Sequence, residues 1–350
     1  MKLDTQTLGE RRPLPLRSTS KTPAGSLWTG SRRVGPFIVA IVIAVMILLW
    51  AGSNNYRLST VILAVSYSLI ALGMYIPVAW ANSLSLAYGA YGAIGAYSVA
   101  VIAKTFGLPV WLGWIVGSLL AAAIAVILAL ATARLLGFHL VAATLLFAFA
   151  FQTWLGHNPA LGQANGLVGV PGLSLFGWVP SAQVLVTAGV ALVLLIAVAM
   201  DRAKFSRWGI IVRSIGEAPL VVSTSGISVP QMTIVVLAIG AGVAALGGSF
   251  FVTSVGGITP ETFNLNVVFL ALFMPLLGGL GTAWGAVVGA ALTVFLTVQW
   301  KVFSAAGGLL VLSIAVLVVL LTVPGGMLGL LSQAGSKVSR LWTARGGVNE

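Results

Sequence analysis

The sequence predicts an all-α polytopic membrane protein with about ten hydrophobic helical segments and both termini in the cytoplasm. Of its 350 residues, 59% are hydrophobic and only 7% are charged, and no Asp or Glu occurs between Glu10 and Asp201. Soluble domains carry about 25% charged residues. A water-facing surface cannot be built from so few charges, so lipid is the solvent for most of this chain.

Ten apolar segments follow one another along the chain, each bounded by Gly, Pro, Asn or charged residues. Because irregular backbone cannot face lipid, such segments must be helices or pieces shielded by helices, some of them broken or re-entrant. They lie at 34–52, 58–77, 84–103, 109–133, 138–156, 182–200, 229–254, 263–278, 282–299 and 305–323. The segments 263–278 and 282–299 are short, so they are either two tilted spans or contain a broken helix.

The chain is accordingly divided into a membrane domain, 34–331, and two cytoplasmic tails, 1–33 and 332–350. The first tail is basic and rich in Pro, Ser and Thr, a composition typical of disorder. With the N-terminus inside, fifteen of the 18 Lys and Arg residues fall on the cytoplasmic side. This asymmetry is the usual topology signal of membrane proteins, and it accounts for the net charge of +12 without nucleic acid as a partner.

Two connecting loops are long enough to carry function. The outer loop 157–181 is rich in Gly and Pro, so it is either a re-entrant element closing a cavity or a surface loop docked onto other loops. The cytoplasmic loop 201–228 holds the only cluster of charges in the interior of the chain. It is either a solvated connector or a segment that docks into another protein.

Capping signals predict two short helices inside the loop 201–228. Ser206 suits the N-cap of a helix that continues through Arg213 and is broken by Gly216. Pro219 suits a first helical position and Gly226 suits the position after a C-cap, so 219–225 is predicted as a second helix.

Small residues recur at helical spacing in two places. Small side chains let helix backbones approach closely in a membrane, where the hydrophobic effect does not drive helix association. The pattern therefore favours tight helix packing, with a solute path between closely packed helices as the alternative. The glycines concerned are Gly89, Gly92, Gly95, Gly281, Gly285 and Gly289.

Polar residues without charge are scattered through the apolar segments and the outer loop. Such side chains either face a hydrated path or bond to backbone and neighbouring helices. The candidates for a solute path are Asn82, Ser85, Tyr88, Tyr91, Gln152, Asn165 and Asn266.

Several kinds of chemistry are absent from the sequence. There is no GxxxxGK[ST] phosphate loop, so ATP hydrolysis is not expected. There is no GxSxG or HExxH motif, so an intramembrane enzyme is not expected. There is no cysteine, so a thiolate metal site is not expected. Carriers driven by protons or sodium usually need charged groups within the membrane. We therefore expect no enzyme activity, no bound cofactor or metal, and energy supplied by a partner.

Four segments, in order, resemble the permease subunits of branched-chain amino acid ABC importers, a group that includes urea and short-chain amide permeases. The resemblance runs from about 58 to 331. SLSLAYGAYGAIGAYSVAVI is similar to the family's "SLGHAAFFGIGAY" helix, and NGLVGVPGL to its "DGLSGIP" element. GIIVRSIGEAPLVVSTSGISV is similar to "GRALRAIRENEIAAEALGINV", and LGGLGTAWGAVVGA to "GGxGTxxGxxxGA".

The resemblance implies a multi-pass permease of the bacterial inner membrane that passes a small polar solute inward. It also implies a second permease subunit, two cytoplasmic ATPases that bind ATP and Mg, and an extracytoplasmic solute-binding protein. The segment 209–229 would then be a coupling helix seated on an ATPase. Its matching residues are Arg213, Ile215, Glu217, Gly226 and Ile227, whereas Gly216 and Pro219 depart from the family pattern.

Other functions remain open at the level of the sequence. A secondary carrier or facilitator for a small neutral solute would work without an ATPase. A monosaccharide-type ABC permease shares the helical style, and a structural or lipid-handling membrane protein would transport nothing.

Overall fold

A computed structural model describes residues 34–52, 54–132, 138–174 and 178–299, together with 314, 317 and 318. The tails 1–33 and 332–350, and nearly all of the predicted segment 305–323, lie outside the described residues. The helices are α1 (Val34–Ala51), α2 (Asn55–Ala81), α3 (Tyr88–Lys104), α4 (Val110–Ala131), α5 (Phe138–His157), α6 (Ala182–Ala203), α7 (Arg207–Glu217), α8 (Pro219–Thr224), α9 (Val229–Val255), α10 (Leu265–Gly278) and α11 (Ala283–Gln299).

The described part of the chain confirms an all-α polytopic membrane protein. Six of its helical stretches are long and apolar enough to cross a bilayer: α2, α4, α5, α6, α9 and Pro260–Gly278, which includes α10. The total of ten segments and the cytoplasmic location of both termini stay predictions.

The centre of the bundle is built from α2, α3 and α9, and α4 packs against both α3 and α9. The backbones approach each other at small residues. A Cβ added to Gly240 would lie 2.5 Å from the carbonyl oxygen of Gly73, and one on Gly248 would overlap that of Gly92. These helices are therefore held together by close backbone packing. Such packing drives helix association in a membrane, where the hydrophobic effect does not.

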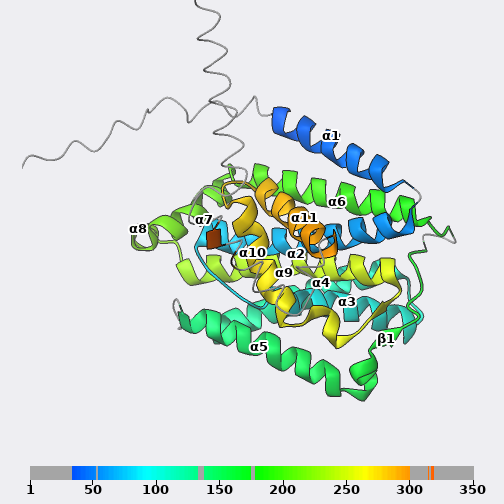
Figure 1. The fold of residues 1–350 in the computed structure, drawn as a ribbon. Coiled ribbons are helices and arrows are strands. Elements are labelled where there is room, and N and C mark those ends of the chain that lie inside the picture. The colour runs from blue at the N-terminus through cyan, green and yellow to red at the C-terminus, as the bar shows by residue number, and fades with distance from the viewer. Residues whose placement is uncertain are drawn as a thin grey trace, which may run out of the picture.

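Two ends of the bundle are distinct in Figure 1: α7 and α8 lie at one end, and β1 lies at the other. The helix α1 runs along one edge beside α6, and α5 runs along the opposite edge. Large apolar side chains are exposed on α4, α5 and α6, as expected of surfaces that face lipid or another membrane subunit.

The loop 157–181 docks onto a second loop. After two short 3₁₀ turns, Pro159–Leu161 (η1) and Gln163–Asn165 (η2), β1 (Leu167–Val168) pairs antiparallel with β2 (Gly257–Ile258), which is followed by the 3₁₀ turn η3 (Pro260–Phe263). Leu167 pairs with Ile258. The Val170 amide donates to the Gly256 carbonyl at 2.9 Å, and Lys104 Nζ donates to the Val168 carbonyl at 2.8 Å. Of the two expectations for this loop, its described residues fit the docked surface loop.

The junction of α2 and α3 differs from the sequence prediction. The helix α2 continues past Pro77 to Ala81, because a proline inside a membrane helix is tolerated where neighbouring helices shield it. Asn82 then takes a left-handed conformation (φ 47°), and its backbone N–H donates to the Pro77 carbonyl. The next helix begins only at Tyr88, so the residues between are an irregular linker that is largely buried.

Candidate functional site

The helix α7 is fixed at its start by the predicted cap. Ser206 Oγ accepts a hydrogen bond from the Gly209 amide at 3.1 Å, as an N-cap residue does. The expected break at Gly216 is wrong, because α7 continues through Gly216 and ends at Glu217. Its C-cap is Ala218, where φ is −147°. Since Gly216 lies within a helix, its lack of a side chain serves close packing rather than a turn.

The helix α7 is amphipathic and packs onto the end of α2. Val212 and Ile215 are buried, while Ile210 is exposed. The indole of Trp208 meets that of Trp80 edge to face, with 6.0 Å between ring centroids. A Cβ on Gly216 would lie 2.6 Å from the Trp80 carbonyl oxygen, so only glycine allows this approach. The position of α7 is therefore tied to the last turn of α2.

The helix α8 follows the predicted pattern of Pro219 in its first turn and Gly226 just beyond its end, where φ is +82°. It ends at Thr224, and its C-cap is Ser225. Leu220 and Val221 are 81% and 66% exposed. These two side chains and Ile210 of α7 are the large apolar side chains exposed on α7 and α8, and they are called here the α7–α8 surface.

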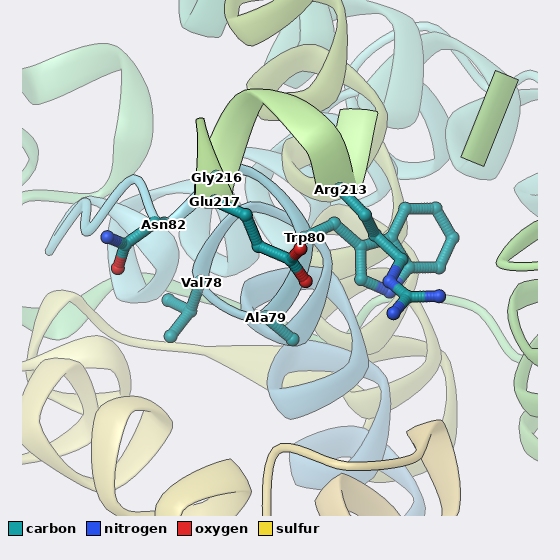
Figure 2. Close-up of a pocket in the computed structure, with 7 residues that line it drawn as sticks. All are labelled: Val78, Ala79, Trp80, Asn82, Arg213, Gly216 and Glu217. Carbon is teal, nitrogen blue, oxygen red and sulfur yellow. The ribbon is translucent and has the colours of Figure 1, made fainter. Parts of the chain in front are cut away.

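A pocket of about 210 Å³ lies between the end of α2 and α7. Figure 2 shows the side chains of Arg213 and Glu217 descending from α7 toward the last turn of α2. Arg213 is half-buried and Glu217 is exposed. Neither side chain forms an ion pair or hydrogen bond with another described residue. The lining consists of Val78, Ala79, Trp80, Asn82, Arg213, Gly216 and Glu217.

The five residues proposed for coupling all lie in or just after α7 and α8, but they differ in burial and in what they contact. Arg213 and Glu217 line the pocket, and Ile215 is buried on the inner face of α7. Gly226 and the half-buried Ile227 form the turn between α8 and α9. Sequence reasoning missed Trp80, Val78 and Leu220, because a tryptophan or aliphatic residue at a helix end has no distinctive pattern of its own.

The seven candidates for a solute path do not meet in one cavity. Ser85, Tyr88 and Tyr91 are buried together around the start of α3, and the rings of Tyr88 and Tyr91 lie 5.4 Å apart. Asn82 lines the pocket beside α7. The remaining three lie elsewhere: Gln152 is half-buried on α5, and Asn165 and Asn266 are exposed in η2 and at the start of α10.

The irregular linker between α2 and α3 is held by a residue that the sequence did not single out. The Leu86 amide donates to Thr144 Oγ1 of α5 at 2.9 Å, and the bond is buried. Thr144 in turn donates to the Val141 carbonyl of its own helix at 3.0 Å. An unpaired backbone amide is costly in an apolar surrounding, so this threonine satisfies a donor that the absent helix leaves free.

The glycines singled out for packing lie at close approaches, with one exception. A Cβ on Gly95 would overlap the Ala245 carbonyl oxygen of α9, and one on Gly89 would lie 2.8 Å from Val268 of α10. Gly92 faces Phe263, Gly285 faces Gly279, and Gly289 faces Met274. At Gly281 the added atom would meet open space. The Gly281 carbonyl instead accepts a hydrogen bond from Lys204 Nζ.

Within the described residues, no group of three or more His, Cys, Asp or Glu side chains is placed to hold a metal ion. The site therefore consists of the α7–α8 surface, the pocket behind it and a closely packed helical bundle. Such an arrangement can dock a partner and transmit a movement of α7 to the membrane helices.

Comparison with known proteins identifies the family. Residues 56–328 match the model of the family described as "Branched-chain amino acid transport system / permease component". The chain belongs to this family. The match includes every element of the site, from α2 to the turn after α8.

Two bacterial relatives are similar over most of this permease-family chain. It is 26% identical over 284 residues to the high-affinity branched-chain amino acid transport system permease protein LivM of Escherichia coli, covering 74% of this chain and 66% of the relative. The protein of the same name from Salmonella typhimurium is 26% identical over 282 residues, covering 73% and 65%. The chain thus spans slightly less than two thirds of the relatives' length. No solved structure matches significantly.

Proposed function

We propose that this chain is the permease subunit of an ATP-driven importer, passing a small polar solute from an extracytoplasmic binding protein to the cytoplasm. The solute class is branched-chain amino acids, urea or short amides. The observation that carries the proposal is the family match over 56–328, because it includes the segment that forms the capped α7 and the exposed α8. The bacterial relatives and the apolar helices support a multi-pass protein of the inner membrane.

The end of the bundle that carries α7 and α8 is assigned to the cytoplasm. The segment 201–228 holds Arg202, Lys204, Arg207 and Arg213, and such basic residues gather on the cytoplasmic side of membrane proteins. The opposite end, with β1 and β2, then faces outward, where a solute-binding protein would deliver its load. A second permease subunit would complete the path within the bilayer.

The α7–α8 surface is the proposed seat of a cytoplasmic ATPase, which binds ATP and Mg and supplies the energy of hydrolysis. Leu220 and Val221 are exposed where the chain leaves the membrane, and a short amphipathic element of this kind fits an apolar groove on a partner. Because α7 is tied to α2 at Gly216 and Trp80, a shift of the ATPase surface would move α2. Transport requires only that the ATPase contact the inward- and outward-facing states differently.

Leu220→Arg tests the seat of the ATPase. A charge at an 81% exposed position should leave the fold intact but disfavour burial in an apolar groove, so the ATPase should copurify at a fraction of its normal ratio. Substrate-stimulated ATP hydrolysis should fall in parallel. Val255→Arg, at a 57% exposed apolar position on the far end of the bundle, is the matched control for ATPase copurification. Normal copurification and hydrolysis with Leu220→Arg would show that α8 is not the docking element.

The family match disfavours the other functions considered from the sequence. The match across 56–328 and the two permease relatives favour a branched-chain amino acid type importer over a secondary carrier, a monosaccharide permease or a lipid-handling protein.

A further inference from the structure

The pocket between α2 and α7 combines two opposite charges with two aliphatic side chains. Its volume of about 210 Å³ is below the roughly 300–1,000 Å³ of pockets for drug-sized ligands, so it suits a small solute. Arg213 and Glu217 come from α7, whereas Val78, Ala79 and Trp80 come from the last turn of α2 and Asn82 from its C-cap. Any molecule that fills it therefore bridges the two helices.

The charges in this pocket are available to a ligand. Arg213 and Glu217 stand four residues apart on α7, a spacing at which oppositely charged side chains can pair, yet neither forms an ion pair with any described residue. A guanidinium binds a carboxylate through two parallel hydrogen bonds, and a glutamate carboxylate accepts bonds from an ammonium group. The pair thus matches a molecule that carries both an anion and a cation.

The aliphatic side chains of the lining can pack against an aliphatic group on that molecule. Val78 and Ala79, which supply them, are half-buried. Burying an aliphatic side chain against them gains about 25 cal/mol for each Å² removed from water. A free α-amino acid with a small aliphatic side chain has the three required parts in one molecule.

We propose that this pocket binds a small aliphatic amino acid in its zwitterionic form from the cytoplasmic side, and that its occupancy slows further uptake. The inference rests on the proposed function for the orientation of the chain and for the solute class. A ligand held by both helices stabilises one position of α7 against α2. It therefore favours one transport state and opposes the movement that the ATPase must impose.

Binding is tested directly on the purified importer complex, without its solute-binding protein, using radiolabelled leucine as the probe. The wild-type complex should bind leucine saturably. Isoamylamine, which lacks the carboxylate, and 4-methylpentanoate, which lacks the amine, should compete about tenfold more weakly or worse, because each leaves one pocket charge unpaired. Equal competition by the amine would overturn the role of Arg213, and equal competition by the acid would overturn that of Glu217.

Two variants locate the bound leucine. Arg213→Gln removes the carboxylate partner, and Val78→Phe enlarges one of the side chains that line the pocket; each should weaken binding about tenfold or more. Ser223→Gln, on an exposed part of α8 outside the pocket, is the control and should bind like wild type. Unchanged binding in both pocket variants would place leucine elsewhere. Loss of ATPase copurification in Arg213→Gln without any leucine binding by the wild type would assign the pocket to the ATPase interface instead.

Regulation is tested by uptake into proteoliposomes that contain the complete importer. The readout is the ratio of initial rates with and without leucine inside, measured for each variant so that a change in basal rate cancels. The ratio should fall severalfold below one for the wild type and return to one for Val78→Phe. Absence of uptake in any condition would contradict the proposed function, whereas normal uptake that ignores internal leucine would contradict only the feedback.

Discussion

At the scale of the residue, the molecule depends on glycines whose missing side chains leave room for a neighbouring backbone. Gly95 meets the carbonyl of Ala245, whereas Gly281, which has the same appearance in the sequence, meets open space. Periodic spacing predicts that small residues lie on a helix flank but not which of them faces another helix. That difference depends on the arrangement of the helices, and it separates structural glycines from incidental ones.

Gly95→Ala and Gly281→Ala should differ in their effect on stability. The added methyl group overlaps backbone at the first position, and a backbone carbonyl cannot move aside as a side chain can. Overpacking of this kind costs about 1–3 kcal/mol. We expect a lower thermal midpoint in detergent for Gly95→Ala and no change for Gly281→Ala. Equal midpoints would show that α3 and α9 do not approach at Gly95.

A second residue-scale prediction concerns Thr144. Thr144→Val should leave the Leu86 amide without a partner and cost about 1–3 kcal/mol. Thr153→Val on the same helix is the matched control, because Thr153 Oγ1 is exposed and donates only to the Phe149 carbonyl of its own helix. Thermal unfolding of the two variants in detergent measures the difference, and an equal effect would contradict the role of Thr144 in holding the linker.

At the scale of the element, local signals predicted the helix caps, whereas contacts across the fold decided how far α7 continues. Ser206, Pro219 and Gly226 take the capping positions that their chemistry favours, because caps depend on neighbouring residues alone. Gly216 was misjudged as a break because glycine weakens an isolated helix. Contact with the Trp80 carbonyl outweighs that weakness, and this contact joins residues far apart in the sequence. The pocket between α2 and α7 could not be predicted either, because its lining also joins residues far apart in the sequence.

Gly216→Leu should uncouple α7 from α2. A side chain at this position must displace α7, since its Cβ would lie 2.6 Å from the Trp80 carbonyl. We expect the ATPase still to copurify, because the exposed side chains of α8 are unchanged, while solute-stimulated hydrolysis falls severalfold. Ser214→Leu, half-buried on the same helix, controls for a larger side chain on α7. Full stimulation by the Gly216→Leu complex would mean that α7 does not transmit movement through α2.

At the scale of the whole molecule, composition decided the class and topology decided the rest. The scarcity of charge predicted a membrane protein, and four short motifs predicted the family that the match over 56–328 then showed. The seven candidate path residues were chosen as polar side chains in apolar sequence, and the fold disperses them over several places. Under the proposed pairing with a second permease subunit, the path is shared between two chains, so polarity in one chain does not locate it.

The same scale carries the central proposal, that a partner ATPase supplies the energy for transport by this chain. No Asp or Glu occurs between Glu10 and Asp201, a range that holds six of the predicted apolar segments. The sequence also has no phosphate-binding loop. The most direct measurement is uptake of labelled leucine by proteoliposomes holding either the purified chain alone or the complete importer with its ATPases and ATP. We expect accumulation above the external concentration only with the complete importer. Accumulation against the gradient by the chain alone would contradict the account.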